Sequence, residues 1–331
     1  MPNEKDLEQA GFFANRLLKR DRHLRKWSRR TDTNCYRVYD RDIPELPLSL
    51  DRYGEAAVLY LYERPYEKPD DEERAWLELM AEAASAALGI EPGSVAIKTR
   101  RRLGVDKQYG KAEDDVGASV RPGSSSGPGE LTVKENGLSF IVNTRDYIDT
   151  GLFMDHRPAR QLVRGRSDGK RVLNLFCYTG SFSVYALAGG ASETVGVDLS
   201  STYLAWADRN IAVNGLDADR YRSVRADASA FLSEATSRGE RFDVIILDPP
   251  TFSNSKRMDG FLDTARHWPR LVSECLATLA PEGTILFSTN ARGLRFDASL
   301  VPGAVATDIS DSTIPEDFRG HPHRTWLIRH A

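Results

Sequence analysis

Short apolar runs alternate with amphipathic segments from Lys170 to the end of the chain. Runs with the length and β-branched content of buried strands are RVLNLF, TVGVD, YRSVRAD, FDVIILD and TILFST. The helix-like segments between them are SFSVYALAGG, TYLAWADRNIAVNG, a stretch near Ala228–Arg238 and a stretch near Phe261–Leu279. Strands that alternate with helices form right-handed βαβ units, so the pattern predicts an α/β domain whose mainly parallel sheet is covered on both faces. WLIRH, near the C-terminus, is expected to add a last strand.

The N-terminal part of the chain follows another pattern. Leu17, Leu24 and Trp27 recur at helical spacing within the first 30 residues. The strand-like runs CYRVYD, AAVLYLYE and SVAIKTR come later. Before the last of these runs, the pattern predicts an amphipathic helix from about Glu72 to Leu88, which Gly89 ends.

A segment rich in glycine, proline and serine, RPGSSSGPGE, spans Arg121 to Glu130 and is predicted to be an exposed loop. We expect it to separate the two strands of a hairpin, the second of which contains LSFIVN. The pattern changes after this hairpin. It predicts a smaller N-terminal α+β domain over residues 1–145 and the α/β domain over residues 146–331.

The net charge of −3 does not make the whole chain a polycation, but the basic residues are unevenly spread. Between Arg16 and Arg30, nine basic residues, His23 included, face the single acid Asp21. A second basic run, KTRRRLGVDKQYGK, covers Lys98 to Lys111. Each run can be an ordinary solvated face. Because phosphate neutralisation drives nucleic-acid binding, two such runs favour a polyanionic partner, and we expect the N-terminal domain to bind RNA.

Composition disfavours several classes of protein and site. No apolar run approaches the roughly 18 residues of a membrane span, so no membrane partner is expected. The start, MPNEKDLEQAGFF, lacks the basic-then-apolar pattern of a signal peptide. Cys35, Cys177 and Cys275 stand far apart without a CxxC pair, so neither a disulfide framework nor a metal site is expected. A reducing cytoplasm is the expected compartment.

Three acids follow predicted strands of the α/β domain. An open α/β sheet binds its ligand at the carboxyl ends of its strands, and Asp198, Asp227 and Asp248 are each expected at such an end. Any one of them can instead cap the helix that follows its strand. Three such acids, together with a rigid proline motif after the last, favour a shared ligand site.

The loop after the first strand of this domain, Asn174 to Ser181, contains one glycine, Gly180, and several large side chains. A dinucleotide site has a GxGxxG loop there, which lets the backbone approach a pyrophosphate, so a nucleoside without phosphates fits better. S-adenosylmethionine is such a molecule. Asp198 is placed to accept hydrogen bonds from both ribose hydroxyls, and Asp227 to accept from the adenine amino group.

The run IILDPPTFSNSK places a carboxylate and two prolines directly after a predicted strand. Proline fixes its own φ and biases the preceding residue toward extended geometry, so Asp248-Pro249-Pro250 is expected to be a rigid turn. Continued to Phe252, the run resembles the (D/N)PP(Y/F) signature of enzymes that methylate nucleobase nitrogens, displaced by one residue. In such sites the acid and the adjacent backbone carbonyl accept hydrogen bonds from the base, and we expect Phe252 to stack on it.

Over nearly its whole length, the chain resembles a family of bacterial ribosomal RNA methyltransferases. The resemblance is to the C-terminal half of the bifunctional large-subunit rRNA guanine methyltransferase, which makes 7-methylguanosine in 23S rRNA. It rests on FANRL, CYRVYD, DYIDTGLFMDHR from Asp146 to Arg157, NLFCYTGS, VDLSSTYLAWADRNIAVNGL and DPPTFSNSKRM. The chain departs from the family in the loop near Ser124 and in the closing RGHPHRTW stretch.

This resemblance implies a Rossmann-like class I methyltransferase sheet, S-adenosylmethionine as the cofactor, and guanine-N7 methylation of 23S rRNA or of a large-subunit precursor. It also implies that Asp155 and Arg157 contact the ammonium and the carboxylate of the cofactor, although the two can equally form an Asp–Arg pair at the surface. The implied cofactor-binding set is Asp155, Arg157, Asn174, Phe176, Tyr178, Thr179, Gly180, Ser181, Asp198, Leu199, Ser200, Asp227, Ala228 and Asp248. The implied catalytic set is Asp248, Pro249, Pro250 and Phe252.

Other functions are compatible with parts of this pattern. Cytosine-5 methylation is rejected because it needs a nucleophilic cysteine on the rim, and the loops DPPTFSNSK and FSTNARG contain none. Methylation of guanine N2 or adenine N6 stays open, since only the resemblance selects N7. A non-catalytic RNA-binding protein with a vestigial methyltransferase domain is the alternative from another class. The sequence leaves the oligomeric state undefined.

Overall fold

A computed structural model of the chain describes residues 3–62, 68–100, 129–253 and 261–331. Packing divides the chain into two compact units, Met1–Met154 and Asp155–Ala331, whereas the change in sequence pattern placed the division after residue 145. Within the described ranges, none of the helices has the length and apolar character that a membrane crossing requires.

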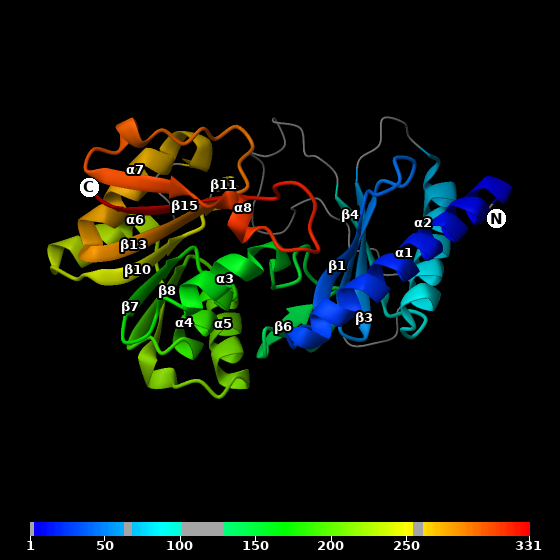
Figure 1. Ribbon diagram of the computed structural model, residues 1–331, viewed down its shortest axis with the longest axis horizontal. Helices are drawn as coiled ribbons and strands as arrows, with labels where there is room; N and C mark the ends of the chain where they lie inside the picture. The colour runs from blue at the N-terminus through cyan, green and yellow to red at the C-terminus, as the bar shows by residue number, and fades with distance from the viewer. Residues whose placement is uncertain (1–2, 63–67, 101–128, 254–260) are drawn as a thin grey trace. The chain divides into compact units, whose positions relative to one another are not determined.

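The N-terminal unit combines helices with a small sheet and a separate hairpin. Its elements are α1 (Glu4–Arg30), β1 (Cys35–Asp40), β2 (Leu48–Tyr53), β3 (Ala56–Tyr62), α2 (Asp70–Leu88), β4 (Val95–Arg100), β5 (Glu130–Glu135) and β6 (Leu138–Asn143). The sheet has the order β1-β2-β3-β4, and β4 runs parallel to β3. Helices α1 and α2 lie side by side in Figure 1, and both contribute to one apolar core with this sheet.

Helix α1 begins at a capping box and buries one face. The Asn3 side chain accepts a hydrogen bond from the Asp6 amide, and the Asp6 side chain accepts one from the Asn3 amide. This reciprocal arrangement satisfies two of the amides that a helix start leaves open. Leu17 and Leu24, two members of the helical repeat in the sequence, are buried, and Trp27 packs against the same core. The predicted first helix is confirmed.

The hairpin expected across the glycine-rich loop is wrong. Strand β6, which contains LSFIVN, pairs antiparallel with β5, which begins at Glu130 where that loop ends. The connecting turn is Asn136-Gly137, whose φ angles of 51° and 79° suit a two-residue hairpin. Strand β4, which precedes the loop, pairs with β3 instead. Residues 121–128 of the loop lie outside the described residues.

The C-terminal unit is a seven-stranded sheet with helices on both faces. Its elements are η1 (Met154–His156), α3 (Arg157–Arg164), β7 (Arg171–Leu175), α4 (Ser181–Ala188), β8 (Glu193–Asp198), α5 (Ser201–Val213), η2 (Ala218–Arg220), β9 (Tyr221–Arg225), α6 (Ala228–Ser237), β10 (Phe242–Leu247), β11 (Phe252–Ser253), β12 (Leu262–Asp263), α7 (Thr264–Thr278), β13 (Leu279–Thr289), η3 (Ala298–Leu300), β14 (Ala304–Asp308), α8 (Ser310–Thr313) and β15 (Arg324–His330). The large sheet has the order β14-β15-β13-β10-β7-β8-β9, in which β15 runs in the direction opposite to the other strands. The predicted parallel sheet and the last strand from WLIRH are confirmed, whereas β14 was not predicted.

Alternate residues of the central strands face two separate cores. Ile245 and Leu247 of β10 belong to a cluster with α6 and α7, whereas Val244 and Ile246 belong to a cluster with α3 and α4. Successive side chains of a strand point to opposite faces, so a continuously apolar strand is what a doubly covered sheet requires. Figure 1 shows α6 and α7 on one side of this sheet and α3 and α4 on the other.

The strand order creates a switch point at the carboxyl ends of β7 and β10. From β7 the chain adds β8 and β9 toward one edge, and then places β10 on the other side of β7. Helix α4, after β7, belongs to one core, and α7, after β10, belongs to the other. In open α/β sheets, ligands bind in the crevice that such a reversal opens. The loops after β7, β8 and β10 therefore mark the expected site.

Candidate active site

The loop after β7 holds two large residues in a backbone conformation that favours glycine. Phe176 and Tyr178 have φ angles of 55° and 50°, and Gly180, directly before α4, has a φ of 73°. At residues other than glycine such conformations cost of order 1–3 kcal/mol, and they cluster at functional sites. A Cβ on Gly180 would lie 2.7 Å from the Cβ of Ala207, so the loop also packs closely on α5. Its shape is therefore tightly determined.

Asp198 ends β8 beside this loop. Its Oδ2 accepts a hydrogen bond from the Tyr178 amide at 3.0 Å, and its Oδ1 accepts one from the Ser200 amide at 2.8 Å. Burial raises the pKa of the Asp198 carboxyl, and the amides oppose that rise because they favour the anion. A carboxylate can accept about four hydrogen bonds, so Asp198 keeps acceptor capacity for a ligand.

Two other predicted residues cap helices. Asp227 caps α6, since its Oδ1 accepts a hydrogen bond from the Ala230 amide at 3.1 Å. Ser200 caps α5, since its hydroxyl accepts one from the Tyr203 amide at 3.3 Å. The capping role considered for Asp227 is thus present in the structure. Leu199, between two residues of the site, is half-buried.

Other predicted cofactor residues form the frame of the site. Asn174 is buried in β7, and its side-chain amide donates to the Ser183 hydroxyl at 3.0 Å. The Thr179 carbonyl accepts a hydrogen bond from the side-chain amide of Asn210 at 2.8 Å. Ser181 begins α4, and Ala228 is buried at the start of α6. These contacts attach the loop after β7 to the helices around it.

The turn Asp248-Pro249-Pro250 is fastened to neighbouring elements. The Thr264 hydroxyl, at the start of α7, donates to the Pro250 carbonyl at 2.6 Å. The Thr251 hydroxyl donates to Asn290 Oδ1, also at 2.6 Å. Pro249 is buried, whereas the Asp248 side chain keeps 27% exposure. The turn therefore delivers one partly exposed carboxylate to the rim.

Phe252 lies at the surface beside this turn. It belongs to β11, where it pairs with Asp263 of β12, and 49% of it is exposed. A ring this exposed contributes little to the apolar core, so it is free to meet a flat ligand. Residues 254–260, which complete the DPPTFSNSKRM motif, lie outside the described residues.

Arg157 is buried rather than at the surface. It begins α3 with 3% exposure, and its guanidinium donates to Asp317 Oδ1 at 2.8 Å. Asp155, in the turn η1, lies 3.1 Å from His323 Nδ1 through its Oδ2. The interpretation of Asp155 and Arg157 as a surface pair is therefore wrong for Arg157. No feature of the sequence pattern pointed to Asp317.

The model of the S-adenosylmethionine-dependent methyltransferase family matches residues 96–308 of the chain. The ribosomal RNA large subunit methyltransferase K of Neisseria meningitidis serogroup B is 43% identical over 322 residues, which cover 96% of this chain and 87% of that protein. This chain belongs to the S-adenosylmethionine-dependent methyltransferases.

Other relatives of this methyltransferase are longer. The ribosomal RNA large subunit methyltransferase K/L of Chromohalobacter salexigens is 45% identical over 97% of this chain but only 42% of that protein. The chain thus spans most of the Neisseria relative and less than half of the Chromohalobacter one. The crystal structure of SMU.776 in complex with SAH matches with a TM-score of 0.75 at 22% identity, covering 96% of this chain and 81% of that chain. The predicted class I methyltransferase fold is confirmed.

S-adenosylmethionine is the cofactor of this methyltransferase. The rim residues fit a nucleoside with two ribose hydroxyls, because Asp198 is an acceptor held in place by two backbone amides. Gly180 also lies close to Ala207, so the loop after β7 packs on α5. A loop that binds a phosphate leaves room for it at the helix N-terminus, so this packing also suits a nucleoside without phosphates.

Two histidines that the sequence analysis did not single out lie beside Asp155 and Asp248. His156 Nε2 is 3.7 Å from Asp248 Oδ2, and the His156 and His323 rings stack on each other. His156 stands inside the DTGLFMDHR motif between Asp155 and Arg157, so its position was an available signal. His323 belongs to the RGHPHRTW stretch that departs from the family, and nothing there pointed to the site.

Proposed function

We propose that this methyltransferase transfers a methyl group to N7 of a guanine in large-subunit ribosomal RNA. The observation that carries the proposal is the fastened Asp248-Pro249-Pro250 turn, which presents a partly exposed carboxylate four residues before the exposed ring of Phe252. Hydrogen-bond acceptors next to an aromatic face recognise a nucleobase that has left its stack. The names of the Neisseria and Chromohalobacter relatives support ribosomal RNA as the substrate class, and the family resemblance selects N7.

The chemistry of N7 asks for position and charge rather than for proton removal. Guanine N7 carries a lone pair and no proton in the neutral base, so no general base is required. When bound, the cofactor supplies an electrophilic methyl group on a positively charged sulfur. Asp248 would accept a hydrogen bond from the base, and its negative charge would favour the positive charge that the base acquires. The prolines would keep this carboxylate in place, so that the N7 of the bound base approaches the methyl group in line with the departing sulfur.

The cofactor contacts are proposed from the same rim. Asp198 would accept hydrogen bonds from the ribose hydroxyls. Asp227 caps α6 with one hydrogen bond, and its carboxylate would accept another from the adenine amino group. Asp155 would face the ammonium group. Arg157 has its charge balanced by the buried Asp317, so we assign it to fixing the turn before α3 in addition to any contact with the cofactor carboxylate.

Helix α1 offers a basic surface for RNA, and seven of its basic residues fall into two sets. Arg16 pairs with Asp42, and Arg25 pairs with Asp21 at 2.6 Å. The other set is exposed, and within the described part of the chain no ion pair is recorded for its side chains: Lys19, Arg22, Lys26, Arg29 and Arg30. At 3.6 residues per turn these five fall within an arc of about 100°, on the side of the helix away from Leu17 and Leu24. We call this set the basic face of α1.

The first residue of the second basic run is buried. Lys98 is 1% exposed, and its ammonium donates to the Tyr147 carbonyl at 2.6 Å and to the Ile148 carbonyl at 3.2 Å. The expectation that Lys98 contacts phosphates is therefore wrong, because its charge is used inside the N-terminal unit. Residues 101–111 of this run lie outside the described residues.

The test is a nucleoside analysis of methylated RNA. Purified protein, methyl-labelled S-adenosylmethionine and ribosomal RNA from a strain that lacks the gene are incubated, and the digested nucleosides are separated by mass spectrometry. We expect labelled 7-methylguanosine from 23S rRNA, and much less of it from the matched Asp248→Ala protein. Label in N2-methylguanosine or N6-methyladenosine would move the proposal to another nitrogen. A protein that binds the cofactor and labels no RNA would contradict it.

A further inference from the structure

Two buried imidazoles lie face to face beside the carboxylates of the site. The His156 and His323 rings have centroids 4.2 Å apart and planes inclined by 13°, and the residues are 7% and 1% exposed. His323 Nδ1 is within hydrogen-bond distance of Asp155 Oδ2, at 3.1 Å. His156 Nε2 lies 3.7 Å from Asp248 Oδ2 and 3.9 Å from Asp155 Oδ2. It is therefore close to two carboxylates, at distances slightly too long for a full hydrogen bond to either.

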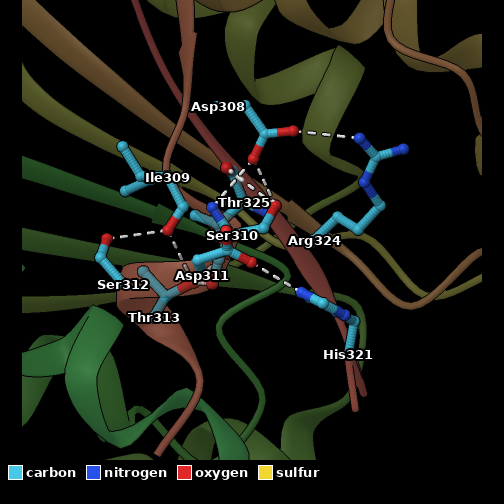
Figure 2. Close-up of polar contacts among 9 residues, drawn as sticks. All are labelled: Asp308, Ile309, Ser310, Asp311, Ser312, Thr313, His321, Arg324 and Thr325. Atoms are coloured by element: carbon cyan, nitrogen blue, oxygen red, sulfur yellow. Dashed lines mark hydrogen bonds and ion pairs between the residues drawn. The ribbon is translucent and has the colours of Figure 1, made fainter.

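The chain on both sides of His323 is hydrogen-bonded to the end of β14 and to the first residues of α8. Figure 2 shows the contacts: His321 Nε2 to Asp311 Oδ1 at 2.8 Å, Arg324 to Asp308 Oδ2 at 3.0 Å, and the Thr325 amide to the Ser310 hydroxyl at 3.0 Å. The last of these is buried, so it anchors the start of β15 most firmly. These contacts fix the backbone on both sides of His323, so its ring is a fixed surface on which the His156 ring stacks.

The stacking argues against a metal ion at this cluster. Donor atoms of Asp155, His156 and His323 lie within 4.8 Å of one another, which is near enough to consider one. A metal ion bound to imidazole sits about 2 Å from the nitrogen, in the plane of the ring where the lone pair points. Two nearly parallel rings, one above the other, share no point that lies in both planes. The cluster is therefore better suited to holding a proton than a metal.

We propose that His156 is a positioning residue for methyl transfer: as a neutral imidazole it holds the Asp248 carboxylate toward the substrate base, and its stack on His323 keeps the ring in place. The inference rests on the proposed role of Asp248 in binding the base, and it is independent of which nitrogen of the base is methylated.

The surroundings of His156 favour the neutral ring. Burial lowers the pKa of His156 below its ordinary value of about 6.5; the charges of Asp248 and Asp155 oppose this, and His323 and Arg160 add to it. Nδ1 is buried and has no hydrogen-bond partner among the described residues. The single proton of the neutral ring therefore belongs on Nε2, the atom near both carboxylates.

The neutral state matters because of the charges in the reaction. The donor is a positively charged sulfonium, and the base gains positive charge as the methyl group arrives. A cationic His156 would weaken the field of the Asp248 carboxylate at the base, where positive charge develops only during the transfer. Above its pKa in the folded protein the ring is neutral, and below that pKa it is a cation. We therefore expect kcat to fall on the acid side of a midpoint that lies below pH 6.5.

Two variants separate the contribution of the Nε2–H group, which faces the carboxylates, from that of packing. His156→Gln keeps an N–H donor that does not titrate, whereas His156→Phe keeps a ring against His323 and loses the donor. We expect kcat of His156→Phe to fall about 100-fold at neutral pH, the cost of a small displacement of a reacting group. His156→Gln should retain more of kcat than His156→Phe and should lose the acid-side decline. Equal losses in both, with the wild-type pH profile preserved, would reduce His156 to packing and overturn the proposal.

A second measurement uses the wild-type protein and needs no variant. The ring nitrogens of ¹⁵N-labelled histidine are followed by NMR across pH, with His156 assigned through its contact with the Phe182 ring, 5.9 Å away between centroids. We expect the neutral form with the proton on Nε2 at neutral pH. A His156 that is a cation at neutral pH overturns the proposal, whatever RNA the enzyme methylates. The nucleoside analysis decides the proposed function separately.

Discussion

The backbone amide of Tyr178 donates to Asp198 Oδ2 at 3.0 Å, and this contact joins the loop after β7 to the end of β8. Tyr178 makes it with a left-handed φ of 50°, a conformation that is unfavourable for a large side chain. A charge-assisted hydrogen bond to a carboxylate offsets part of that cost. The loop and the acid therefore determine each other's positions, and a change at either one should be felt at the cofactor.

Replacing Asp198 tests its proposed role toward the ribose. We expect Asp198→Ala to weaken S-adenosylmethionine binding by about 1.5–3 kcal/mol, the range for hydrogen bonds to a charged group. The Tyr178 amide also loses its partner, which places the loss toward the upper end. Titration calorimetry measures the change, and Asp297→Ala, which removes an exposed acid that caps η3, is the matched control. An unchanged dissociation constant in folded Asp198→Ala would remove this assignment.

Asp248 and Phe252 should affect turnover more than cofactor binding. Both are assigned to the base, and an interaction made mainly in the transition state lowers kcat with little effect on ground-state affinity. We expect Asp248→Ala and Phe252→Ala to lower kcat while the dissociation constant of the cofactor changes less. Phe252→Trp keeps a stacking ring and should retain more activity than Phe252→Ala. If Phe252→Ala methylates at the wild-type rate, stacking by this ring is not part of the reaction.

The buried pair of Arg157 and Asp317 makes a prediction about stability. Removing one partner of a buried ion pair leaves an uncompensated charge, so Asp317→Ala should lower the free energy of unfolding by about 3–5 kcal/mol. Asp311→Ala is the control, because its pair with His321 is exposed and should change stability by less than about 1 kcal/mol. Urea denaturation of the two variants measures the difference. Equal midpoints would show that Arg157 is satisfied without Asp317.

Most strands of the C-terminal unit could be predicted because a strand that is buried on both faces is a continuous run of apolar residues in the sequence. Val244 to Leu247 are all apolar since each residue meets one core or the other. The acids at the ends of β8 and β10 follow directly from these strands, so their place on the rim could be predicted as well. What each acid contacts could not, because Asp227 has the same sequence setting as Asp198 and caps a helix.

The strands that were not predicted lack such a continuous apolar run. Strand β14 lies at the edge of the sheet and is largely exposed, so its short apolar content resembles a loop. Strand β2 contains Asp51, which is buried only because Arg37 of β1 donates to it at 2.7 Å. The contact between Asp155 and His323 joins positions far apart in the chain. Local pattern carries no information on such partners, which depend on how the elements pack.

The basic face of α1 makes the last prediction, and salt dependence is the measurement that distinguishes phosphate contacts from solvated charges. Each phosphate contact with a single strand contributes about 0.7 to the slope of log K against log salt. If the face follows the RNA backbone, Lys19→Ala/Lys26→Ala/Arg29→Ala should weaken binding of a 23S rRNA fragment and reduce that slope by roughly 2. Arg238→Ala/Arg266→Ala/Arg270→Ala removes the same charge from exposed positions, directly after α6 and on α7, that already pair with nearby acids. This variant should change the slope much less. Both triple variants should bind S-adenosylmethionine like the wild type, because none of the six residues belongs to the proposed cofactor site. Equal slopes for the two variants would mean that the charge of the whole protein attracts the RNA, and that α1 carries no specific contact.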